Sequence, residues 1–349
     1  MITFGSIFAS SWPKIFQILS VIVIFFGFYG IAFAAGARIK GKKQNSLAIG
    51  LFLVPALILV MTGLGIPAIQ TFMESFKNAD SSQWVGLKNY SNAIHDPDIR
   101  LAFINTISWV IICPVIVTAL GISLATMLNK MKREAFAKSL IFMPMAISFV
   151  GGSLIWNLMY AYQEPAHAQT GLVGQIMTWL HIDVKHLLLW SPWNNLFLMV
   201  VYIWGFTGFA MVILSAAIKG IPTEIEEAAQ LDGATGIRLF RTITVPMVRT
   251  TIIVVLTTAM VGTLKLFDVI HTMTGGNFKT DVLSNRMFDE NFVYLNYGRG
   301  SALAVLIFLG VIPITYYNIR SLRLERKHYC LTKATHLAVH LLPPSHRWL

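Results

Sequence analysis

Charged residues are scarce in this sequence and make up only 12% of its 349 positions. Soluble domains carry about 25% charged residues, so the deficit excludes an ordinary soluble protein. Hydrophobic residues account for 55% of the chain. Many of them stand in uninterrupted runs of about 20 residues, the length of a membrane-spanning helix. A membrane β-barrel would instead show alternating strands of roughly ten residues. We therefore predict an all-α, polytopic membrane bundle.

Cysteine is also scarce, with only two in the chain. Cys113 lies in an apolar run and Cys330 in the tail, so the pair supports neither a disulfide framework nor a zinc site. The histidines of the tail match no metal-ligand spacing, and we predict no metal site. The phosphate-binding pattern G-x-x-x-x-G-K-[ST] is absent, so the chain is not expected to hydrolyse ATP. We see no candidate nucleophile or acid–base group within the predicted spans, so we predict no catalytic residue.

The net charge of +11 reflects membrane topology and not nucleic-acid binding, because the basic residues cluster in short loops between apolar runs. We predict about seven transmembrane helices, at 15–37, 47–70, 102–128, 138–160, 194–218, 246–270 and 300–319. The basic loops follow the first, third, fifth and seventh of these. Basic loops stay on the cytoplasmic side, so we expect the N-terminus outside and the C-terminus in the cytoplasm.

These predicted spans divide the chain into three parts. Residues 1–46 form an extra N-terminal transmembrane helix with a basic cytoplasmic loop, and residues 47–320 form the main transmembrane domain. Residues 321–349 form a cytoplasmic tail whose weak patterning is typical of a disordered extension.

A polar segment at 219–246 separates the fifth and sixth predicted spans. Pro222 ends the preceding helix, and Thr223 with Glu226 three residues later matches a capping box that starts a new one. Gly233 is expected to end that helix, a second short helix follows at 235–245, and Pro246 fits the first turn of the next span. An amphipathic hairpin on the membrane surface and a docking element for a soluble protein both fit this pattern.

The segment resembles a known signature. Glu227-Ala228-Ala229, then Gly233, then Ile243-Thr244-Val245-Pro246 match the EAA motif of permease subunits of bacterial ABC importers. The wider pattern resembles the carbohydrate branch, the MalF/UgpA-like sugar permeases. Further similarities lie at Gly86–Tyr90, Asn105-Thr106, Phe267–Ile270 and Met273–Gly276. The resemblance covers about 50–320. Val245 replaces the usual leucine, the tail after Arg326 matches nothing in the family, and the first span is an extra helix found in some members.

The resemblance implies a multi-pass subunit in the bacterial inner membrane that forms half of a sugar pathway. It implies three protein partners: a second, MalG-like permease, a cytoplasmic MalK-like ATPase dimer and an extracytoplasmic sugar-binding protein. ATP and Mg would be used by the ATPase, with no cofactor bound to this chain. The residues implied in ATPase coupling are Glu226, Glu227, Ala228, Ala229, Asp232, Gly233, Phe240, Ile243 and Pro246. Among them, Glu227 would pair with a basic residue of the ATPase.

Polar and aromatic residues inside predicted spans are candidates for the substrate pathway, because they are costly in lipid. They are Asn157, Tyr202, Trp204, Lys265 and Asp268. Two alternatives stay open: Lys265 and Asp268 can pair with each other, and Trp204 lies beside Gly205 and Gly208, which suit helix packing. The favoured substrate is a di- or oligosaccharide such as an α-glucoside or maltose. The alternatives are glycerol phosphate or another non-sugar substrate, or an ion-driven carrier.

The predicted outer loop 161–193 is rich in aromatic residues, including Trp179, Trp190 and Trp193. They fit an aromatic belt at the membrane surface. They also fit the docking of an extracytoplasmic partner or stacking against a sugar.

Overall fold

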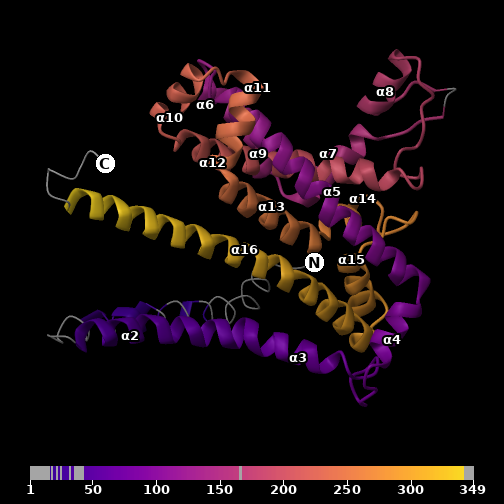
Figure 1. Ribbon diagram of the computed structural model, residues 1–349. Coiled ribbons are helices and arrows are strands. Elements are labelled where there is room, and N and C mark those ends of the chain that lie inside the picture. The colour runs from indigo at the N-terminus through magenta and orange to yellow at the C-terminus, as the bar shows by residue number, and fades with distance from the viewer. Residues whose placement is uncertain are drawn as a thin grey trace. The chain divides into compact units, whose positions relative to one another are not determined.

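The computed structural model describes residues 43–164 and 167–341, together with scattered positions between 16 and 34 (Figure 1). Within these residues all regular secondary-structure elements are helices, and the only β pairing is a single bridge between Lys77 and Trp84. The predicted all-α class is confirmed. The chain divides into two compact units, 1–71 and 72–349.

The first unit contains α2 (Lys43–Val60), the π-helical turn η1 (Met61–Gly65) and most of α3 (Ile66–Glu74). Residues 53–74 form a candidate span, corresponding to the predicted span 47–70. Most of its exposed side chains are apolar, among them Leu57, Leu64 and Ile69, as expected of a helix in lipid. The predicted first span at 15–37 lies mostly outside the described residues.

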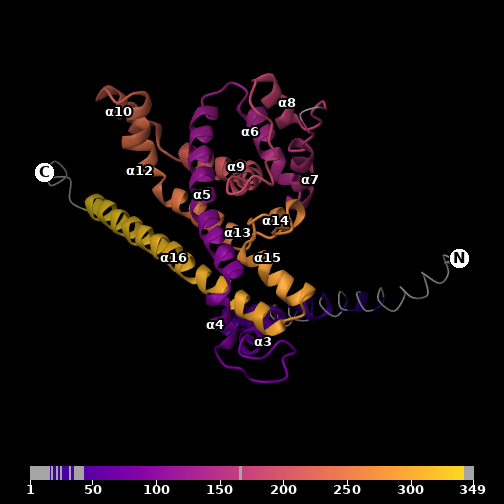
Figure 2. The ribbon, with the colours of Figure 1, turned by 90° about the vertical axis from the view of Figure 1, so that its right-hand side faces the viewer.

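Two long helices, α5 (Pro97–Leu128) and α9 (Asn194–Lys219), form the centre of the second unit and lie against each other (Figure 2). They approach closely at Gly121, where an added Cβ would stand 2.6 Å from Cβ of Ala210. Small residues at such crossings let backbones pack tightly when hydrophobicity alone cannot drive association. The buried core includes Trp109 and Met211.

Two predicted spans are broken rather than continuous. In the region predicted as 138–160, α6 (Glu134–Phe142) and the 3₁₀ turn η2 (Met143–Ala146) meet α7 (Phe149–Met159) at a 99° bend. Ser148 causes the new start, because its hydroxyl caps α7 by accepting a hydrogen bond from the Gly151 amide at 3.1 Å.

The sixth predicted span, 246–270, is broken twice. The first bend, of 74°, separates α12 (Val245–Met247) from α13 (Arg249–Leu264), and a second break separates α13 from α14 (Asp268–Met273). Pro246 lies in the first turn of α12, where its missing N–H costs no hydrogen bond. The described residues therefore hold four continuous candidate spans, or six when each bent pair counts as one.

The remaining elements are shorter, apart from the last helix. They are α4 (Lys88–His95), α8 (Leu172–Trp179), α10 (Thr223–Leu231), α11 (Gly236–Leu239), the π-helical turn η3 (Phe240–Thr244), α15 (Leu283–Phe288), the π-helical turn η4 (Asp289–Val293) and α16 (Tyr297–Leu341). α16 continues well past the predicted end of its span at 319, through the first part of the predicted tail. Residues 342–349 lie outside the described part of the chain.

Candidate functional site

The segment after α9 folds into a helical hairpin. α9 ends at Lys219, and α10 (Thr223–Leu231) begins directly after Pro222. The predicted capping box is wrong: Pro222 occupies the N-cap, and no side chain caps the helix. Because Pro222 is extended, the helix starts at Thr223 itself, one residue too early for the Thr223 hydroxyl to cap it. Glu224 and Glu226 still lie in the first turn, where acids favour the positive end of the helix dipole.

Gly233 ends this helix as predicted. Its φ of +80° is left-handed, a conformation that favours glycine. The Ala234 amide then donates to the Ala229 carbonyl at 2.9 Å, and the Gly233 amide donates to Gln230 at 3.0 Å. This closed turn satisfies the last carbonyls of the helix. It also folds the chain back so that Ala229 and Ala234 pack with Leu239 and Ile243.

The outer face of the hairpin combines acids with exposed apolar side chains. Glu227, Ala228 and Asp232 are exposed, and Leu231 keeps 90% of its surface accessible. Ala229 points the other way, into the hairpin core. A rigid helix with a protruding leucine between acids has the form of an element that enters a cleft in another protein.

The other predicted coupling residues occupy the hairpin's inner and rear parts. Phe240 is half-buried and packs on the main core, while Ile243 packs on the small hairpin core. Glu226 is half-buried and Pro246 is exposed. Phe240 and Ile243 therefore hold the hairpin in place, so the exposed face contains only part of the motif.

A polar cluster fastens the hairpin to the bundle just before it begins. Glu134 of α6 forms ion pairs with Lys138 and Lys219, the last residue of α9. Lys138 also donates to Asn129 at 2.7 Å and to Ser215. The end of α5, the start of α6 and the end of α9 are thus tied together.

The proposed pathway residues do not gather into one site. Tyr202 is fully buried, stacked against Phe149 and Phe206, and its hydroxyl donates to the Ala259 carbonyl at 3.1 Å. Lys265 is exposed at the end of α13, whereas Asp268 opens α14. The helix break between them removes the predicted i, i+3 spacing, and among the described residues the two form no ion pair.

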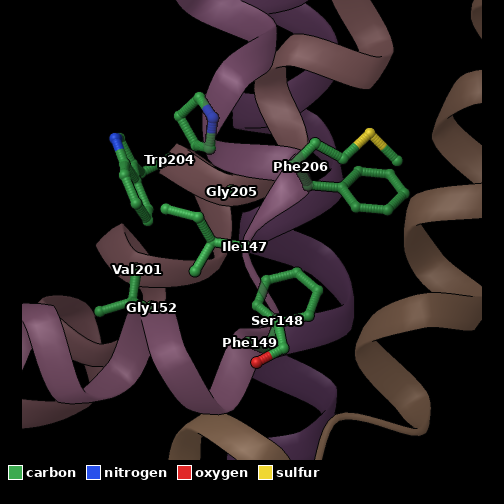
Figure 3. Close-up of a pocket in the computed structure, with 10 residues that line it drawn as sticks. Ile147, Ser148, Phe149, Gly152, Val201, Trp204, Gly205 and Phe206 are labelled. Carbon is green, nitrogen blue, oxygen red and sulfur yellow. The ribbon is translucent and has the colours of Figure 1, made fainter.

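Trp204 lines a cavity of about 260 Å³ where the broken span meets α9 (Figure 3). The side chains of Ile147, Ser148 and Phe149 come from the break itself, and Trp204 and Phe206 come from α9. Asn157 is half-buried further along α7 and does not line this cavity. The predictions missed Ser148, and its only local signal was that serine is a favoured N-cap residue.

One of the motifs noted outside the coupling segment, Asn105-Thr106, contacts the residues that follow the Met273–Gly276 motif. The Asn105 side chain donates to the carbonyls of Lys279 and Asp281, at 2.9 and 2.8 Å, and the Thr106 hydroxyl accepts from the Leu283 amide at 2.9 Å. Gly276 has a φ of +78°, and a Cβ there would lie 2.6 Å from the side-chain Nδ2 of Asn285. These residues pin the segment between α14 and α15 onto α5.

Asp281 makes this segment sensitive to pH. Burial raises the pKa of its carboxyl to about 6, against hydrogen bonds from Asn285 and the Val282 amide that lower it. A raised folded-state pKa gives stability that is complete below the unfolded pKa near 3.8 and is lost as pH rises through about 6.

We therefore expect Asp281→Asn, which keeps the acceptor oxygen, to raise the melting temperature at pH 7 relative to the parent chain. The gain corresponds to at most about 3 kcal/mol and should disappear at pH 4. Thermal melting in detergent at both pH values measures it. Asp98→Asn, at an exposed position, is the control. An equal melting temperature for Asp281→Asn and its parent at pH 7 would contradict the raised pKa of the Asp281 carboxyl.

Comparison with known proteins places this geometry in context. Residues 104–322 match the family model described as "Binding-protein-dependent transport system inner membrane component". The chain is 43% identical over 277 residues to the osmoprotective compounds uptake permease protein GgtC of Synechocystis sp., covering 79% of this chain and 99% of that one. It is 42% identical over 290 residues to the alpha-glucoside transport system permease protein AglF of Rhizobium meliloti, covering 83% and 86%.

The fold is similar to that of a chain in the crystal structure of a bacterial alginate ABC transporter in complex with an alginate pentasaccharide-bound periplasmic protein. The TM-score is 0.70 at 21% identity, over 79% of this chain and 94% of that chain. The likeness shows a similar helical fold.

Proposed function

Because this chain belongs to the binding-protein-dependent transport system inner membrane component family, we propose that it forms half of a sugar pathway and is driven through α10 by a cytoplasmic ATPase dimer. The chain is a non-catalytic, multi-pass permease of an ABC importer, and ATP is used by its partner ATPase. An ion-driven carrier is no longer an alternative. The observation that carries the coupling proposal is the rigid hairpin whose exposed face presents Glu227 and Leu231.

The partner proteins follow from the same mechanism. A second permease would complete the pathway, and an extracytoplasmic sugar-binding protein would deliver the substrate. The basic loops favour an orientation with the N-terminus outside and α10 in the cytoplasm. In this arrangement residues 47–320 form the transport domain, with 1–46 as an added helix and 321–349 as a cytoplasmic extension.

The proposed substrate is an α-linked di- or oligosaccharide. Support comes from the 42% identity to a permease named for alpha-glucoside transport. A second candidate is an osmoprotective compound, supported by the 43% identity to GgtC. Glycerol phosphate is less favoured, since the relative named for it is only 27% identical.

An uptake assay separates these candidates. The complete transporter in proteoliposomes is given maltose, trehalose, sucrose, glycine betaine or glycerol 3-phosphate in turn, each with the cognate binding protein and internal ATP. ATP-dependent uptake of an α-glucoside supports the first proposal. Uptake of glycine betaine alone or glycerol 3-phosphate alone would overturn it.

The cavity at the helix break is the part of the pathway best suited to a sugar. It is lined by the Trp204 ring, an apolar face for sugar C–H groups, and elsewhere by Ser148, which carries a hydroxyl. Of the other candidates, Asn157 and Asp268 are half-buried and stay proposals, Lys265 is exposed, and Tyr202 serves the core.

We expect Trp204→Ala to reduce sugar uptake several-fold, because it removes the stacking face, while the assembled complex is recovered in normal amount. Tyr202→Phe is the matched control in the same helix: it loses one hydrogen bond, worth about 1 kcal/mol, and keeps the aromatic stack. Uptake rates and complex yield are measured for both. Unchanged uptake with Trp204→Ala would remove the cavity from the pathway.

A further inference from the structure

The loop between α7 and α9 carries an apolar surface that neither transport nor coupling explains. α8 packs on α7, and Val173 and Met177 contact the core from one of its faces. The opposite face carries Leu172, Ile176 and Trp179, at i, i+4 and i+7, all exposed. Trp179 keeps 82% of its surface accessible. A helix that is apolar on both faces needs a cover on each.

The turn after α8 extends this surface. The His181 backbone is left-handed, with a φ of 57°, and the Ile182 amide donates to the Met177 carbonyl at 2.9 Å. Leu180 and Ile182 are also exposed. We call Leu172, Ile176, Trp179, Leu180 and Ile182 the α8 patch, and none of these residues is charged.

The patch is held in a fixed position by the chain around it. The Gln169 side chain forms two hydrogen bonds with the backbone of Gln163. It accepts one from the Gln163 amide at 3.0 Å and donates one to the Gln163 carbonyl at 2.7 Å. Gly171 passes so close to Ala161 that an added Cβ would lie 2.3 Å from its carbonyl oxygen. The patch is therefore a built surface and not a loose loop.

Its surroundings mark the edge of the membrane. The loop that carries the patch runs from the end of α7, where Leu158 is exposed, to the start of α9, where Trp193 is exposed. Trp190 lies 6.3 Å from Trp193, and the Lys185 ammonium lies 4.3 Å over the Trp190 ring. Tryptophan and lysine at a helix entrance are typical of the headgroup region, where the cation faces lipid phosphate.

We propose that α8 is an interfacial helix whose patch is inserted in the outer part of the lipid bilayer. The occupant is lipid because a binding protein that associates and dissociates in each cycle would leave so large an apolar face uncovered between cycles. Docking surfaces of that kind are about as polar as the rest of a protein surface. Figure 1 shows α8 well separated from α10, so this anchor and the coupling hairpin are distinct elements.

Spin labels test the proposal in the complete transporter reconstituted in lipid vesicles. Ile176→Cys and Trp179→Cys are labelled in a Cys330→Ser background, which retains the buried Cys113 that the reagent does not reach. Thr178→Cys, exposed on the flank of the same helix, is the matched control. Collisions with oxygen, which concentrates in lipid, and with a water-soluble nickel complex are measured at each site.

Labels at 176 and 179 should collide often with oxygen and rarely with nickel, with the reverse at 178, and adding binding protein should change neither. Frequent nickel collisions that binding protein suppresses would overturn the proposal in favour of protein docking. Rare collisions with both reagents would overturn it in favour of burial against the second permease. None of these outcomes depends on the identity of the substrate.

Discussion

Glu227→Lys should reduce sugar uptake to background while the chain is still inserted and assembled with the second permease. Glu227 is exposed on α10 and forms no ion pair among the described residues, so reversing its charge should leave the fold intact. Removing one partner of a buried charge pair costs about 3–5 kcal/mol, and a lysine facing a basic cleft adds repulsion. The ATPase should therefore bind at least about 100-fold more weakly.

Glu224→Lys is the matched control, because it makes the same charge change one turn earlier on the same exposed helix. It should retain most of the uptake. Uptake by proteoliposomes and the amount of ATPase that co-purifies are compared for both variants. An equal loss of uptake in the two variants would mean that the net charge of α10, and not Glu227, governs coupling. Normal uptake by Glu227→Lys would show that Glu227 forms no essential charge pair with the ATPase.

Gly208→Ala should destabilise the bundle by about 1–3 kcal/mol, through overpacking where α9 crosses α6. A Cβ at position 208 would stand 2.6 Å from the Ile141 carbonyl oxygen and 2.8 Å from Cα of Phe142. Both obstacles are backbone atoms, so no side-chain rotation relieves the clash. The two helices would have to separate, and the cavity lined by Trp204 lies next to this crossing.

Gly310→Ala gives the comparison, because its Cβ would meet only Leu264 side-chain atoms at 3.6 and 3.7 Å, an ordinary contact. Its melting temperature should stay near that of the parent chain. Thermal unfolding in detergent and the yield of folded protein are measured for both. A Gly208→Ala variant as stable as Gly310→Ala would show that the crossing is looser than the structure has it.

The spans and the coupling hairpin were largely predictable, because both depend on local signals. Long apolar runs must be helical in lipid, and glycine is favoured where a helix ends in a left-handed turn, as at Gly233. The breaks at Ser148 and Val248 were not predicted, since composition gives the length of an apolar run but not its straightness. Pro144 and Pro246 lie close to these breaks, yet proline also occurs within α5, at Pro114, where the helix continues.

The site was predicted less completely, because burial and partners depend on tertiary structure. Tyr202 was predicted to be a pathway residue because of its polar hydroxyl, but that hydroxyl donates a hydrogen bond to the Ala259 carbonyl in the core. Leu231 was not singled out, as a leucine in a helix ordinarily faces inward. The contact of Asn105 with residues 279 and 281 joins positions more than 170 apart, beyond the reach of any local pattern.

The most direct test of the coupling account is a photo-crosslink from the tip of the hairpin. A photoreactive p-benzoylphenylalanine replaces Leu231 in the complete transporter, with Leu309, an exposed residue of a span, replaced in the control. The coupling account predicts a product with the mass of this chain plus one ATPase subunit from position 231 and none from position 309. Crosslinks from position 231 only to lipid or to the second permease would contradict it.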